Sequence, residues 1–208
     1  MSRNFPAQHF KPEILKTKFN ISFGQFNLKE GQFDHASSLH GIMHTYRVMS
    51  HVILLGIQTG ALAEARNAFF AAYIHDMARK HDGYCTQHGA DAANLKLPDY
   101  ISLFAENGAS AADILTIGKA VTYHSLGREV GKNDPDWLTV ALLKDADALD
   151  RIRLGENDLD PAYLRIPETH LMIEHARSLY FLTFNSPVEN FETILEMAIS
   201  LQDTIKRS

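Results

Sequence analysis

The feature that most constrains the fold of this chain is a short apolar segment that ends in two ionisable residues. Residues 68–74, AFFAAYI, carry no charged side chain, and His75 and Asp76 follow directly. A helix that is apolar on every side is buried in the middle of a domain. Asp76 would then enter the core, where an unpaired carboxylate is costly unless it is neutralised or bound to a cation.

Helical periodicity continues over most of the chain. Apolar residues recur at steps of four, three and four from Ile42 to Ile53, and Gly56 follows as a predicted C-cap. Residues 1–35 are aromatic-rich and irregular, so we expect them to pack on the domain as an extended N-terminal segment. A length of 208 residues suits one domain. The sequence therefore predicts an all-α fold with a single compact helical domain over residues 36–208.

The expected helices have recognisable ends. Asp134 is a predicted N-cap with Pro135 at the favoured first position, and the helix that starts at His88 is expected to end before Pro98. No strand-like element longer than a few residues follows residue 35. The helices are predicted at residues 35–55, 61–79, 88–95, 109–124, 135–151, 168–184 and 188–206.

Composition excludes several classes of protein. A net charge of -5 provides no excess of basic residues for binding a long nucleic acid. Cys85 is the only cysteine, so the chain has no internal disulfide and no zinc site built from cysteines, and we expect a cytoplasmic protein. The apolar runs are far shorter than the roughly 20 residues of a membrane span. We therefore expect no membrane partner.

Histidine and aspartate are the residues left to hold a metal. The chain has 11 histidines, and imidazole with carboxylate suits Mn, Fe, Co, Ni or Zn better than a pure Mg or Ca site. Asp147 continues the apolar stripe of Val140 and Leu143 and is expected to point inward, whereas Asp145 projects to the opposite side. A further polar stripe on one predicted helix face contains His40, His44, Arg47 and His51.

The order of these residues resembles the HD superfamily of metal-dependent phosphohydrolases. His44 lies in HTYRV, His75 and Asp76 in YIHDMARK, and Asp147 in LLKDADALD, so the resemblance covers residues 36–155. It implies an HD-type helical domain in which these four residues hold a divalent metal. Members with two metals have two more histidines between the His-Asp pair and the last aspartate, and His88 and His124 occupy that interval. The alternative is that His88 and His124 only cap helices.

The resemblance also suggests catalytic residues. Asp76 would bridge two metals that hold a hydroxide in line with phosphorus. His40 stands four residues before the first ligand and is a candidate ligand, a candidate general acid for the leaving group, or neither. Arg79, supported by Arg47, would neutralise charge on phosphoryl oxygens, and Lys80 is a weaker choice. A second His-Asp pair at residues 81–82 receives no role.

The expected reaction is hydrolysis of a phosphoester in a nucleotide-like or other small phosphorylated substrate. One alternative is a di-iron oxygenase, because the HD fold also includes oxygenases with the same ligand types. A second alternative is a non-catalytic metal-binding regulatory module. The sequence does not select the substrate, and magnesium remains a further candidate for the metal.

Overall fold

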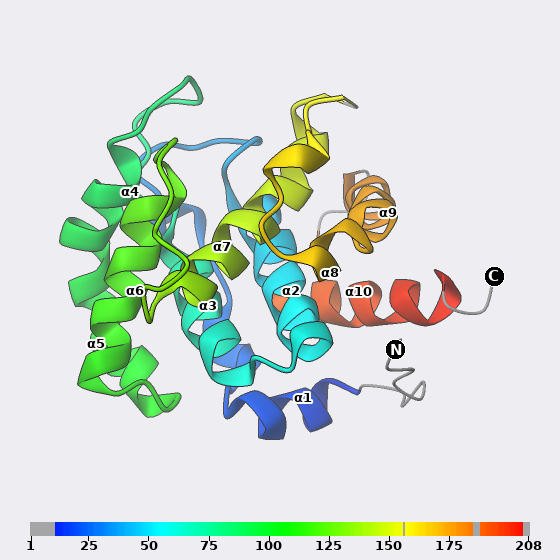
Figure 1. The fold of residues 1–208 in the computed structure, drawn as a ribbon, viewed down its shortest axis with the longest axis horizontal. Helices are drawn as coiled ribbons and strands as arrows, with labels where there is room; N and C mark the ends of the chain where they lie inside the picture. The colour runs from blue at the N-terminus through cyan, green and yellow to red at the C-terminus, as the bar shows by residue number, and fades with distance from the viewer. Residues whose placement is uncertain (1–10, 156, 185–187, 206–208) are drawn as a thin grey trace.

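The computed structural model describes residues 11–155, 157–184 and 188–205. Within these residues the chain is helical and has no strand, which confirms the predicted all-α class (Figure 1). None of the described helices is long and apolar enough to cross a membrane. The α-helices are α1 (Pro12–Phe19), α2 (Ile42–Thr59), α3 (Leu62–Ile74), α4 (His88–Asp91), α5 (Leu97–Glu106), α6 (Ala111–His124), α7 (Trp137–Leu149), α8 (Pro167–His170), α9 (Ile173–Phe184) and α10 (Phe191–Ile205).

Helices α2, α3 and α7 form the centre of a compact bundle. Each of the three contacts the other two, α6 lies against α3 and α7, and α10 lies against α2. In Figure 1 the pair α5 and α6 stands on the left of this centre and α9 and α10 on the right. Residues 65–74 of α3 are all buried except Arg66, as the apolar segment predicts. The polar residues at the ends of these central helices therefore lie inside the molecule.

The N-terminal segment is more regular than the sequence suggested. Pro12 begins α1, where its missing N–H group costs no hydrogen bond, and two 3₁₀ turns follow at Phe23–Phe26 and Glu30–Gln32. The segment packs on the domain as expected, since Phe23 and Phe26 are fully buried against Phe69 of α3. Residues 1–10 of the predicted segment lie outside the described residues.

The predicted C-cap of α2 at Gly56 is wrong. The helix continues to Thr59, and Gly60 takes the left-handed conformation that ends it, with φ +74°. Gly56 instead lies where α2 and α3 approach closely, because a Cβ atom on it would stand 2.3 Å from the Cβ of Ala65. The helix also starts later than predicted, at Ile42, so residues 35–41 reach it as a loop.

Two other predicted boundaries differ for local reasons. The helical region that begins at His88 passes through a π-helical stretch (Ala92–Lys96) and continues into α5, where Pro98 lies in the first turn and tolerates the loss of its N–H. Helix α7 begins at Trp137 with Asp136 as its N-cap, not at Pro135. The carboxylate of Asp134 accepts the backbone N–H of Asp136 at 3.0 Å, in the turn before the helix, and also binds Lys119 of α6.

The C-terminal helices also divide differently. The predicted helix over residues 168–184 is split into α8 and α9, and α10 begins at Phe191 instead of residue 188. Its predicted end at Lys206 lies outside the described residues. A 3₁₀ turn at Asp150–Arg153 follows α7, and another at Pro161–Tyr163 precedes α8.

Candidate metal centre

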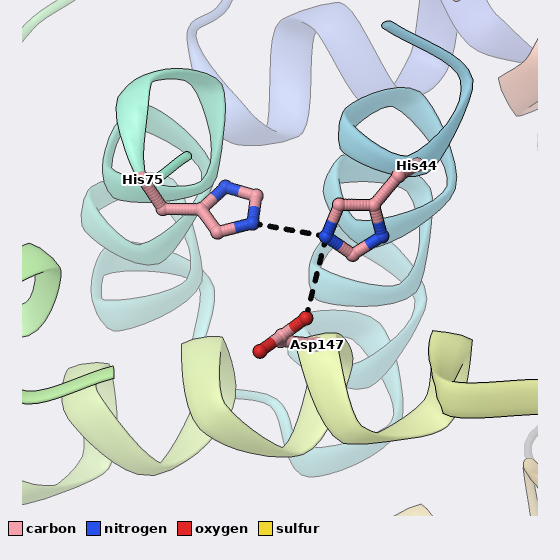
Figure 2. Close-up of side chains that lie close together, drawn as sticks. All are labelled: His44, His75 and Asp147. Atoms are coloured by element: carbon pink, nitrogen blue, oxygen red, sulfur yellow. Dashed lines mark hydrogen bonds and ion pairs between the residues drawn. The ribbon is translucent and has the colours of Figure 1, made fainter. Parts of the chain in front are cut away.

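Six histidine and aspartate side chains from separate elements converge on one point between the central helices. Helix α3 ends at Ile74, so His75 and Asp76 lie in the turn that follows it. Helix α2 contributes from its first turn, α4 and α6 from one end each, and α7 from its last turns. Figure 2 shows three of these side chains pointing toward one another across α2, α3 and α7. The six residues are His44, His75, Asp76, His88, His124 and Asp147.

The first group of donor atoms surrounds His44. Its Nε2 atom lies 3.2 Å from Nε2 of His75 and 3.3 Å from Oδ1 of Asp147. Oδ2 of Asp76 lies 3.5 Å from each of these two Nε2 atoms. The donor atoms of His44, His75 and Asp147 all lie within 4.8 Å of one another, a spacing that could hold a metal ion.

The second group lies on the other oxygen of Asp76. Oδ1 of Asp76 lies 3.1 Å from Nε2 of His88 and 3.7 Å from Nε2 of His124. The two Nε2 atoms of His88 and His124 are 2.9 Å apart. Asp76 thus presents one carboxylate oxygen to each group, and His75, Asp76 and His124 form a second set of donor atoms with metal-ligand spacing.

Hydrogen bonds at the opposite ring nitrogen fix the state of these imidazoles. Nδ1 of three of the histidines lies within hydrogen-bond distance of a backbone carbonyl oxygen three residues earlier. A carbonyl oxygen only accepts hydrogen bonds, so Nδ1 carries the hydrogen and, in a neutral ring, Nε2 carries the lone pair. The pairs are His75 with Ala72 at 2.6 Å, His88 with Cys85 at 2.9 Å, and His124 with Val121 at 2.5 Å.

In these tautomers the Nε2 lone pairs of the histidines are suited to bind a cation. The Nε2 atoms of His88 and His124 face each other at 2.9 Å, and two lone pairs cannot form a hydrogen bond. Two nitrogens bound to one ion at about 2.1 Å stand roughly 3.0–3.4 Å apart for bond angles of about 90–110°. The observed separations of 2.9 and 3.2 Å are close to this range. The residues present therefore fit a divalent ion held by imidazole and carboxylate.

His44 has a carboxylate partner that the sequence analysis missed. Its Nδ1 lies 2.8 Å from Oδ2 of Asp150, a fully buried residue. The signal was available, because Asp150 follows Asp147 by three residues and so falls on a similar helical face. A carboxylate on the second nitrogen orients a ligating imidazole and increases its basicity.

The carboxylates around His44 oppose the effect of burial on its pKa. Burial and Arg153 lower its pKa, but Asp147, Asp150 and Asp76 outweigh them and raise the pKa to about 9. Burial raises the pKa of Asp76, yet His75 and the neighbouring histidines hold it well below the usual value. Without a metal, a proton on His44 would supply positive charge among these carboxylates. A bound cation would replace that proton.

Arg47 and Arg79 both bind carboxylates of the chain. Nε of Arg47 lies 2.5 Å from Oδ1 of Asp150, Nη2 lies 3.0 Å from Oδ2, and Nη1 reaches Thr183 at 3.3 Å. These contacts use one N–H group on each of its three nitrogens, so Arg47 holds Asp150 and Thr183 at the inner side of the centre. Nε of Arg79 donates to Oδ1 of Asp76 at 2.8 Å. Lys80, the weaker choice, is exposed and paired with Asp34.

His40 lies beside the centre but outside both sets of metal-ligand spacing. It is buried in the loop before α2, and its ring stands perpendicular to that of His44 with centroids 6.0 Å apart. Burial lowers the pKa of His40, while the nearby charge of Asp76 raises it. The structure thus places His40 next to the ligands without adding it to either set.

Asp145 projects away from the centre as predicted, but this side of α7 is also buried. Asp145 is fully buried and accepts hydrogen bonds from the backbone N–H groups of Arg165 and Ile166 and from the hydroxyl of Thr169. The segment that leads into α8 covers this side of α7, which a helical wheel for α7 alone does not reveal. Asp147 faces the centre, although its side chain keeps 28% exposure.

Comparisons with known proteins gave no match to a family model, to a curated protein or to a solved structure. The interpretation of the centre therefore rests on its own geometry and on the motifs of the sequence.

Proposed function

We propose that this protein is a metal-dependent phosphohydrolase of the HD superfamily. The observation that carries the proposal is the arrangement of imidazole Nε2 atoms around Asp76, which presents one oxygen to His44 and His75 and the other to His88 and His124. This arrangement matches the ligand roles that the HD resemblance assigns to the same residues. A phosphoester of a small molecule is the proposed substrate.

Two divalent ions are the proposed cofactor, with Mn, Fe, Co, Ni and Zn as the leading candidates and Mg as a further one. When bound, they would supply Lewis-acid polarisation of a phosphoryl oxygen and a lowered pKa for water at neutral pH. One ion would be held by His44, His75, Asp76 and Asp147. The other would be held by Asp76, His88 and His124.

The chain's own cations would bind the phosphate group. Arg79 uses Nε and Nη1 for Asp76 and the Gly83 carbonyl, and its Nη2 makes no hydrogen bond within the described part of the chain. That N–H group is available to a phosphoryl oxygen beside Asp76. Arg153 stands on the other side, with Nη2 3.9 Å from Oδ1 of Asp147. It is a second cation near the place where charge develops.

His40 would transfer the proton that the leaving group needs. Its ring lies next to that of His44, and Nε2 of His40 makes no hydrogen bond within the described residues. An imidazole in that position can give a proton to the leaving oxygen as the P–O bond breaks. Asp76 keeps the ligand role and is catalytic through the ions that it would bridge.

A cavity along the loop that leads into α2 supports a small substrate. It has a volume of about 720 Å³, and its walls include Arg153, Gly41 and Tyr180. Small-molecule sites commonly have volumes of about 300–1,000 Å³ and mixed apolar and polar walls. We propose that the part of the substrate beyond the phosphate lies there. The proposed location of the reaction is the cytoplasm, in keeping with a chain that has one cysteine.

The test is the source of the oxygen atom in the product. A screen of phosphomonoesters and phosphodiesters with Mn, Co, Ni and Mg would first identify a substrate. Turnover in ¹⁸O-labelled water under argon should then place label in the released phosphate or phosphomonoester, and Mn or Co should restore activity to chelated protein. Strict dependence on iron and dioxygen, with no label from water, would overturn the hydrolase and favour an HD-type oxygenase.

A further inference from the structure

The second His-Asp pair of the sequence lies beside His40. Nδ1 of His40 and Oδ1 of Asp82 are 3.0 Å apart, and the hydroxyl of Ser37 donates to the same oxygen. Nε2 of His35 lies 3.5 Å from Oδ2 of Asp82. From the sequence alone this pair has no expected role, because it lies in a polar loop beside Gly83. The structure instead connects Asp82 to a buried histidine next to the metal centre.

Ser37 fixes both members of this contact. Its hydroxyl hydrogen goes to Asp82, while its oxygen accepts the backbone N–H of Leu39 at 3.0 Å and that of His40 at 2.8 Å. A hydroxyl has one hydrogen and two lone pairs, so the Ser37 hydroxyl makes every hydrogen bond that it can. The backbone of His40 and the carboxylate that binds its ring are therefore held by one side chain.

Asp82 determines which nitrogen of His40 carries hydrogen. Hydrogen bonds from Ser37 and His40 lower the pKa of Asp82 to about 2, so the carboxylate is ionised at neutral pH and only accepts. Nδ1 of His40 must then be the donor. Nε2 is left to exchange a proton with a partner outside the chain, because it makes no hydrogen bond within the described residues.

The same loop also positions Arg79. Nη1 of Arg79 donates to the backbone carbonyl of Gly83 at 3.3 Å, and Nε donates to Asp76. Residues 82 and 83 thus contact both side chains that the proposed function uses beside the ligands, His40 and Arg79.

We propose that Asp82, held by Ser37, is the positioning residue that fixes His40 in its Nδ1–H form and presents Nε2 to the leaving group. This inference rests on the proposed function. In the reaction, water forms the new O–P bond and releases a proton to solvent. His40 in its Nδ1–H form first takes a proton from solvent on Nε2. The bond from phosphorus to the leaving oxygen then breaks, its electron pair stays on that oxygen, and the oxygen takes this proton from Nε2. His40 returns to its neutral Nδ1–H form, so the balance closes without another reactant.

Leaving-group dependence tests the use of His40. Phenolate needs a proton to leave and p-nitrophenolate does not, so the metal-loaded protein is assayed with the monoesters and diesters of both phenols. Asp82→Asn should lower kcat on the phenyl esters on the order of 10²-fold, the scale of general acid catalysis, and change kcat on the p-nitrophenyl esters by less than about 3-fold. Asp82→Asn added to His40→Gln should cause no further loss, because Asp82 acts through His40.

Nitrogen-15 NMR tests the positioning without any substrate. In zinc-loaded, histidine-labelled protein, the His40 resonances are identified by their loss in His40→Gln. Wild-type protein should show hydrogen on Nδ1, and Asp82→Ala should move it to Nε2, the form that neutral histidine favours in water. Asp134→Asn is the matched control, since Asp134 is a loop aspartate paired with Lys119 and should change neither the tautomer nor the rates.

The outcomes separate the two proposals. Hydrogen on Nε2 and not on Nδ1 of the His40 ring in the wild type, or an equal loss on both phenols in Asp82→Asn, would overturn the positioning role. Failure of the wild type to hydrolyse any of the esters or any compound in the substrate screen would overturn the proposed function and the use of His40 in it. The NMR measurement of the His40 tautomer would still show whether Asp82 positions the His40 ring.

Discussion

Two histidines of helix α2 lie two turns apart and meet opposite environments. His44 and His51 are both fully buried, and each has a second histidine ring edge-on to its own, His75 at 64° in one case and His175 at 74° in the other. The two sites are separated by about 10 Å along the helix. The carboxylates of Asp76, Asp147 and Asp150 surround His44, whereas both ring nitrogens of His51 lack a hydrogen-bond partner within the described residues.

The difference shows what turns buried histidine into a candidate metal site. Burial alone disfavours the charged imidazole, and it lowers the pKa of His51 to about 3. The same burial acts on His44, but three carboxylates raise its pKa to about 9. Histidine clustering therefore does not distinguish the two sites. The negative charge of nearby carboxylates, which requires a cation, distinguishes them.

Removal of the bridging carboxylate should have the largest effect. We expect Asp76→Ala to lose both metals, and its activity should fall at least about 10³-fold, equal to about 4 kcal/mol of barrier. His51→Leu is the control on the other side of the comparison and should keep its metals. Elemental analysis of the purified proteins is the measurement. Full metal content in Asp76→Ala would contradict the assignment of the centre.

The second group of donors can be separated from the first. His88→Ala and His124→Ala should each retain about one metal per chain and lose activity about 10²-fold, because only one ion is affected. Metal content and kcat measured on the same samples check this. Unchanged activity in both variants would indicate a mononuclear enzyme, and loss of all metal would indicate that the two ions bind as a unit.

The fold was largely predictable because the periodicity of α2 and the uniformly apolar segment of α3 report burial directly. The boundaries that failed depend on contacts between distant parts of the chain. Gly56 resembles a C-cap in sequence, but close packing against Ala65 explains its presence. Pro98 resembles a helix end, but the π-helical stretch before it allows the chain to continue.

The centre was predictable from motifs, whereas its supporting contacts were not. His44, His75 and Asp147 come together as expected. Asp82 and Asp150 were missed because their roles follow from the rings that they contact, and such contacts across the fold leave no local pattern. The burial of Asp145 was not predictable from its own helix, because a later segment covers its side of α7.

The two histidines should give metal-free protein opposite pH dependences. Between pH 6.5 and 9 the folded protein keeps a proton on His44 that the unfolded chain loses, so this contribution is present below pH 6.5 and is lost as the pH rises through 9. Between pH 6.5 and 3 the unfolded chain binds a proton that buried His51 refuses, so stability falls as the pH falls. At most, His44 contributes about 3 kcal/mol and His51 about 5 kcal/mol, since one pKa unit equals about 1.4 kcal/mol.

Urea unfolding of chelated protein at pH 5, 6.5 and 9 measures both contributions. His44→Gln should flatten the alkaline side, and His51→Leu should reduce the slope on the acid side, where His75 also contributes because burial lowers its pKa to about 3. An alkaline fall in stability that His44→Gln leaves unchanged would show that the three carboxylates do not act on His44 as described.

The smallest effect is expected at His51 near neutral pH. His51→Leu replaces a buried side chain without hydrogen-bond partners by an apolar one of similar size, so the free energy of unfolding should stay within about 1 kcal/mol of the wild type or increase. Urea unfolding at pH 7 checks this. A loss of several kcal/mol would reveal a partner for His51 and weaken the contrast with His44.

The most direct test of the metal centre is the position of the ions themselves. Crystals of the full chain, loaded with manganese or zinc and measured at the absorption edge of that metal, locate ions by anomalous scattering. We expect peaks at about 2.0–2.2 Å from the Nε2 atoms of His44 and His75 and from those of His88 and His124, with a carboxylate oxygen of Asp76 on each ion. Metal-loaded crystals with no anomalous peak at Asp76 would contradict the account.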